Sequence, residues 1–102
     1  MSQITMILNK FVELVLENSD DFIDSVEYRK RTSVHNKDEH QNVIDALKSD
    51  DITELREALC YAWYQKPLAG VISCSNYMSE DLKMELLVLH REFRYNLQDI
   101  EL

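Results

Sequence analysis

Apolar residues recur at helical spacing along most of the chain, most clearly between residues 52 and 64. The apolar positions there are Ile52, Leu55, Leu59 and Ala62, at steps of three, four and three. Residues at these steps share one face of an α-helix, and Trp63 widens that face. The spacing therefore predicts a central core helix over residues 52–64, with Trp63 on its inward side.

Both ends of this predicted helix carry sequence signals. Asp50 and Asp51 precede it, and their carboxylates can accept hydrogen bonds from free N–H groups and complement the positive helix end. Pro67 follows it and disfavours a helical conformation at Lys66. The helix is therefore expected to end before Pro67.

The same periodicity predicts four more helices, over residues 3–18, 20–31, 37–48 and 80–95. The residues that precede them suit N-caps: Ser2, Ser19, Asn36 and Ser79. Asn36 with Glu39 three positions on resembles a capping box. Two points stay open. The first is whether the junction at residues 18–19 is a break or only a kink, and the second is whether residues 68–74 form a short helix or an extended loop.

Length and composition favour one helical domain spanning residues 1–102. The chain has 102 residues, one glycine and one proline, and this scarcity of turn residues argues against a turn-rich β protein. The prediction is an all-α fold, a single small domain of about five helices packed as antiparallel hairpins. No stretch approaches the roughly 20 apolar residues of a membrane span, and no targeting segment precedes the first helix, so a cytoplasmic protein is expected.

Histidines give no recognisable site. His35 and His40 are five residues apart, whereas four would place two metal ligands on one helical face. His90 lies at the edge of an apolar face and is interpreted as a core or boundary histidine with a hydrogen-bond partner. The sequence therefore predicts no metal site.

Cysteines and glycines give no catalytic motif either. Cys60 lies among apolar residues, which should raise the pKa of its thiol, and Cys74 has no base beside it in sequence. Both are interpreted as free thiols in a reducing compartment. A single glycine makes a phosphate-binding loop improbable. The prediction is a protein that is not an enzyme and holds no cofactor.

Charge points to the kind of partner. The net charge of −8 repels nucleic acid and anionic membranes and attracts a basic protein, although it also serves solubility alone. Residues 29–31 are Arg-Lys-Arg at a predicted helix end, where they complement the helix dipole. A phosphate-binding patch is the alternative interpretation of these three residues.

Two acidic regions are candidate binding surfaces. The first has six acids between Glu13 and Glu27. The second joins acids to nearby aromatic residues: Asp45, Asp50, Asp51, Glu54, Glu57, Tyr61 and Tyr64. Acids speed association, whereas a desolvated aromatic side chain slows dissociation. The second region has both features and is the predicted partner-binding site, unless its tyrosines instead pack against residues 68–74.

The second half of the chain resembles helical-hairpin units of HEAT-like bacterial immunity proteins, which neutralise toxins delivered between competing cells. The similar parts are Leu55-x-x-Ala58-Leu59-x-x-Ala62-Trp63 and the segment 93–100. The chain departs from the family pattern by lacking a His-Glu pair before Asp99. The resemblance implies a binding role.

Together, charge and resemblance predict an immunity protein or inhibitor that neutralises a basic toxin such as a nuclease. The alternative is a homodimeric helical scaffold or regulatory protein. It is suggested by the first helix, where Val12, Leu14 and Leu16 exceed a single apolar stripe.

Overall fold

The computed structural model describes residues 2–100, and between these residues the chain is helical with no strand. The elements are α1 (Gln3–Glu17), α2 (Ser19–Thr32), α3 (Lys37–Ser49), α4 (Ile52–Cys60), η1 (Ala62–Tyr64), α5 (Gln65–Ser73), α6 (Glu80–Arg94) and η2 (Leu97–Asp99), where η marks a 3₁₀-helix. The all-α prediction is confirmed. The described part has six α-helices rather than five, because residues 68–73 belong to α5.

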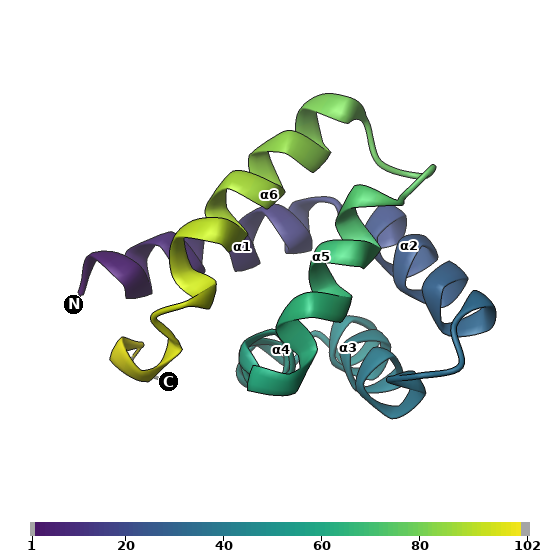
Figure 1. Ribbon diagram of the computed structural model, residues 1–102, viewed down its shortest axis with the longest axis horizontal. Helices are drawn as coiled ribbons and strands as arrows, with labels where there is room; N and C mark the ends of the chain where they lie inside the picture. Colours follow the sequence, from purple (N-terminus) through teal and green to yellow (C-terminus); the bar gives the residue numbers. More distant parts are fainter. Residues whose placement is uncertain (1, 101–102) are drawn as a thin grey trace.

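The helices pack partly as hairpins and partly across the chain. α2 packs on α3 and α3 on α4, whereas α1 packs chiefly on α6. Figure 1 shows α6 alongside α1, α5 at the centre, and α3 and α4 seen nearly end-on below it. The first and last helices therefore close the fold, so it is not a simple succession of antiparallel hairpins.

Aromatic and aliphatic side chains from every α-helix form one core. Phe11 of α1 meets Phe93 of α6 edge-on, with ring centroids 5.3 Å apart. On α1, Val12 is buried, and Leu14 and Leu16 pack against the same core. The broad apolar face of α1 is thus used within one chain, and it no longer motivates a homodimer.

No helix among residues 2–100 combines the length and the apolar character that crossing a bilayer requires.

Three predicted helix caps are confirmed and two are wrong. The side chains of Ser2, Asp51 and Ser79 accept from backbone N–H groups at 3.1, 3.0 and 3.2 Å. Asn36 makes no side-chain cap, because its backbone is left-handed with φ 63°, so the expected capping box does not form. Ser19 is the first residue of α2 rather than its cap, and α1 and α2 are separate helices.

The predicted helix over residues 52–64 is wrong in its last four residues. α4 ends at Cys60, where Tyr61 leaves the helical conformation with φ −59° and ψ 125°. The Gln65 Nε2 group donates to the carbonyl oxygens of Leu59 at 2.7 Å and Tyr61 at 2.8 Å. The Leu59 carbonyl has no backbone amide partner among residues 2–100 at the end of α4, so the Gln65 amide takes that place, whereas the Tyr61 carbonyl also accepts from the N–H of Tyr64.

The change of direction after α4 shifts the helical phase, so Trp63 is 76% exposed instead of facing the core. Pro67 does not end a helix; it lies in the first turn of α5. A first-turn residue needs no intrahelical acceptor for its nitrogen, and proline has no N–H to satisfy.

A hydrogen-bonded chain of buried groups ties α6 to this corner. His90 Nε2 lies 2.9 Å from Gln65 Oε1. Both hydrogens of the Gln65 amide donate to backbone carbonyls, so Oε1 accepts and His90 Nε2 carries the proton. Burial, with a smaller contribution from Arg94, lowers the pKa of His90 to about 4. The interpretation of His90 as a hydrogen-bonded core histidine is confirmed.

This buried imidazole predicts loss of stability in mild acid. Its pKa is depressed to about 4 in the folded state, from 6.5 in the unfolded state. The unfolded chain therefore binds the proton first, so the stability that neutral His90 contributes is full above pH 6.5 and is lost as pH falls toward 4. Between pH 7 and pH 5 the free energy of unfolding should fall by roughly 2 kcal/mol. Urea unfolding at several pH values measures this fall.

The matched control is His90→Gln, whose amide can donate to Gln65 and does not titrate. It should flatten most of the slope between pH 7 and pH 5. Burial and the nearby Arg29 also lower the pKa of His40, which leaves a smaller slope of the same sign. A wild-type profile that is flat over this range would contradict the assignment.

Candidate partner-binding site

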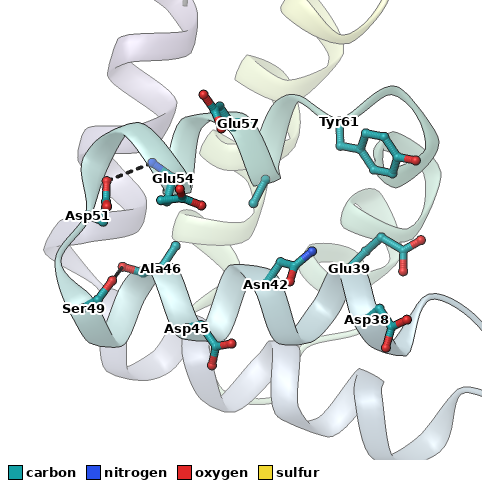
Figure 2. A pocket seen from close by; sticks show the side chains of 11 residues that line it. Asp38, Glu39, Asn42, Asp45, Ala46, Ser49, Asp51, Glu54, Glu57 and Tyr61 are labelled. Carbon is teal, nitrogen blue, oxygen red and sulfur yellow. Dashed lines mark hydrogen bonds between the residues drawn. The ribbon is translucent and has the colours of Figure 1, made fainter.

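A groove with acidic walls runs between α3 and α4 (Figure 2). Its volume is about 810 Å³. It is lined by Asp38, Glu39, Asn42, Asp45, Ala46, Ser49, Asp51, Glu54, Glu57, Ala58 and Tyr61. These residues define the acidic groove.

The groove forms because two polar helix faces meet along an antiparallel pair. On α3 the lining positions 38, 42, 45 and 49 are spaced four, three and four apart, which keeps them on one helical face. On α4 the positions 57 and 58 lie three and four residues after position 54, so the three share one face, and Tyr61 follows directly after the helix. The short turn at Asp50 and Asp51 sends α4 back along α3, and Figure 2 shows Asp51 and Glu54 at one end and Tyr61 at the other.

The electrostatics of the acidic groove are one-sided. Six of its eleven lining residues are Asp or Glu, and none is Lys, Arg or His. Lys48 of α3 instead lies 3.5 Å from Glu27 of α2. Carboxylates gathered along low-dielectric walls focus a negative potential that attracts cations.

Two of these carboxylates also have structural roles. Asp45 accepts from Gln41 Nε2 at 2.7 Å, and Asp51 caps α4 through the N–H of Glu54. Glu54 and Glu57 are exposed, and neither side chain makes a hydrogen bond or ion pair with another of the residues 2–100. These two are therefore the residues whose charge can be reversed with least effect on folding.

The structure brings together five of the seven predicted site residues: Asp45, Asp51, Glu54, Glu57 and Tyr61. Asp50 is exposed but does not line the groove; it adopts a left-handed conformation with φ 56° and ends α3. Tyr64 was expected at the surface, and this is wrong. Its side chain is 0% exposed, and its hydroxyl lies 2.7 Å from His40 Nδ1.

Burial shifts the pKa values of Tyr64, His40 and Cys60. It raises the pKa of Tyr64 well above its usual value and lowers that of His40. Both groups are therefore neutral near pH 7, and the tyrosine hydroxyl and the imidazole nitrogen share one hydrogen bond. Burial also raises the pKa of Cys60 to about 11, as expected, whereas Cys74 is exposed.

Six lining residues are not among the predicted site residues: Asp38, Glu39, Asn42, Ala46, Ser49 and Ala58. Asp38 and Glu39 lie in the first turn of α3, where the sequence alone indicates no more than acids at a helix start. The signal that would have found them is the polar stripe at positions 38, 42, 45 and 49, on the side of α3 away from its buried residues. The sequence could not show that this stripe packs opposite the polar stripe of α4.

The acids between Glu13 and Glu27 line no part of the acidic groove. Within residues 2–100, no three Asp, Glu, His or Cys side chains come close enough to hold a metal ion.

Searches of protein-family models, curated proteins and solved structures found no match to this chain.

Proposed function

We propose that this protein binds a basic protein through the acidic groove. The observation that carries the proposal is the pair of facing stripes with six carboxylates and no cationic side chain among the lining residues. Solubility alone would require only that acids be scattered over the surface of the protein. Their alignment along both walls of one groove favours a cationic partner.

The groove suits cationic side chains rather than a compact ion. Its acids are spread over the lengths of α3 and α4, so several lysines or arginines of a partner could pair with them at once. Tyr61 is 49% exposed at one end, where its ring can pack against an arginine or lysine. Charge steers such a partner to the groove, and the aromatic contact slows its release.

The most specific form of the proposal is an immunity protein or inhibitor of a basic toxin such as a nuclease. Toxic nucleases carry basic substrate clefts, and an acidic helical binder could cover such a cleft. The family resemblance of residues 52–102 supports the same kind of partner. The proposed role is stoichiometric binding without catalysis.

Reversing two groove charges should weaken binding. The double variant Glu54→Lys with Glu57→Lys is expected to reduce association with a basic partner roughly tenfold at low salt, because rim charges act mainly on the association rate. Capture from a lysate of the native host, followed by binding kinetics with the retained protein, measures the effect. Asp51 is left unchanged because it caps α4.

The matched control is Asp20→Lys with Asp24→Lys, which also replaces two exposed acids in the early turns of one helix. Each double variant moves the formal net charge from −8 to −4, since each reverses two carboxylates. The control should change association much less. If both variants weakened binding equally, overall charge rather than the groove would be responsible.

A further inference from the structure

The corner where α2, the 33–36 loop and α5 converge holds a second cavity of about 600 Å³. It is lined by Arg29, Ser33, His35, Asn36, His40, Ala62, Trp63, Lys66, Pro67 and Gly70. No lining residue is acidic, although the chain carries a net charge of −8. We call it the Arg29 pocket.

Arg29 lies in this pocket without a counter-ion. Its side chain is only partly exposed, its Nε atom is buried with no hydrogen-bond partner, and no carboxylate pairs with it among residues 2–100. The two basic neighbours in sequence are engaged elsewhere: Lys30 donates to Gln41, and Arg31 lies over the Tyr28 ring. Of the three adjacent cations that the alternative interpretation joins in a phosphate-binding patch, only Arg29 lines the pocket.

A half-buried guanidinium without a partner is costly, and an oxyanion bound beside it would relieve that cost. Guanidinium groups bind carboxylates and phosphates through two parallel N–H···O bonds. Lys66, exposed at the rim, adds a second cation within the same lining.

The pocket also offers an apolar plane. Trp63 is 76% exposed, and it lines the pocket beside Pro67. A large exposed indole next to a cationic site can stack on a planar ring. The volume is in the usual range for a small organic ligand.

Gly70 provides the space that Arg29 occupies. A Cβ atom at this position would lie 3.0 Å from Arg29 Nη2 and 3.5 Å from its Cζ. Glycine inside an α-helix lowers stability by about 1 kcal/mol relative to alanine, yet here it lets the guanidinium pack against α5.

We propose that the Arg29 pocket binds a small aromatic anion, with a carboxylate or phosphate group at Arg29 and Lys66 and the ring against Trp63. A nucleic acid is disfavoured as the ligand, because the acidic remainder of the chain repels a polyanion, whereas a small anion meets mainly the local positive field. The site is independent of the acidic groove.

The chain carries two unique reporters of this pocket, since it has one tryptophan and one glycine. In a ¹H–¹⁵N NMR spectrum the indole N–H of Trp63 and the amide of Gly70 are therefore recognisable without full assignment. Phenyl phosphate should shift both signals saturably, with a dissociation constant on the order of 1 mM. Benzoate in place of phenyl phosphate tests which oxyanion is preferred.

Inorganic phosphate and phenol each supply half of the ligand, and both should bind at least about tenfold more weakly than phenyl phosphate. Equal binding of inorganic phosphate would overturn the role of the ring. Equal binding of phenol would overturn the role of the anion. Absence of a saturable shift with either aromatic anion would overturn the whole proposal.

Variants test each contact. Arg29→Gln and Lys66→Gln should each weaken phenyl phosphate binding, Arg29→Gln by about tenfold or more because it removes charge-assisted hydrogen bonds. Lys10→Gln removes the same charge from the exposed surface of α1 and should have no effect. If it weakened binding as much as Lys66→Gln, the anion would be responding to overall charge.

Gly70→Ala separates binding from stability. Because no hydrogen bond among residues 2–100 holds the Arg29 side chain in place, its end can move away from the new methyl group, and the variant should gain stability through better helix propensity. The displaced guanidinium should bind phenyl phosphate severalfold more weakly, as followed by the Trp63 indole signal. A stable Gly70→Ala variant with unchanged affinity would show that the position of Arg29 does not matter.

Discussion

Tyr64→Ala is expected to lower the free energy of unfolding by about 3–5 kcal/mol, the range for truncating a large buried ring. The Tyr64 side chain is 0% exposed, and its hydroxyl bonds to buried His40. Removing it leaves a cavity and an imidazole nitrogen without its partner. Since domains of this kind are stable by roughly 5–15 kcal/mol, the variant should be close to unfolding at 37 °C. Thermal and urea unfolding followed by circular dichroism measure the loss.

Tyr64→Phe isolates the hydrogen bond from the packing. It keeps the ring and removes the hydroxyl, so the expected loss is only about 1–2 kcal/mol. A surface role for Tyr64 gives the opposite result, in which the alanine variant folds normally and only partner binding suffers. That result would contradict the buried position of the ring.

Gln65→Ala is expected to cost about 3 kcal/mol, although glutamine is seldom critical at a helix start. One amide here serves three partners: the carbonyls of Leu59 and Tyr61, and the ring of His90. Alanine leaves the Leu59 carbonyl and the His90 ring N–H in a mostly buried site without that amide, while the Tyr61 carbonyl keeps the N–H of Tyr64. Each buried group left without a partner costs about 1–3 kcal/mol unless water replaces it. Chemical unfolding at pH 7.5, where His90 is neutral, measures the effect.

Gln65→Glu is the matched control, because glutamate has nearly the same size as glutamine but lacks its N–H donors. Its carboxylate can accept from His90 but cannot donate to the two carbonyls, and it brings negative charge beside them. It should therefore be no more stable than Gln65→Ala and should raise the pKa of His90. A Gln65→Glu variant as stable as the wild type would contradict the hydrogen-bond pattern assigned to this corner.

Much of the fold could be predicted from local chemistry. The caps at Ser2, Asp51 and Ser79 act within one helical turn, and the buried face of α3 follows directly from its periodicity. Such features depend on residues close in sequence, so spacing alone identifies them.

The failures at the end of α4 and at the groove share a different cause, which is contact between separate helices. The end of α4 depends on the Gln65 side chain, which reaches back from α5 to the Leu59 carbonyl. The chain changes direction there, so Trp63 lies at the surface and Tyr64 in the core. Periodicity before the break cannot reveal the shift in phase after it. Likewise, the acids of α4 were recognisable, but the stripe on α3 becomes part of a site only when the two helices pack together.

Partner binding at the acidic groove is tested most directly by carbodiimide cross-linking of the complex with the captured basic partner. The reagent joins a carboxylate to a lysine amine only where the two are in contact, and mass spectrometry identifies the carboxylates used. Cross-links are predicted at groove residues, chiefly Glu54 and Glu57, and at Asp38 on the facing helix. Cross-links confined to the acids between Glu13 and Glu27 would contradict the proposal and place the interface on α1 and α2.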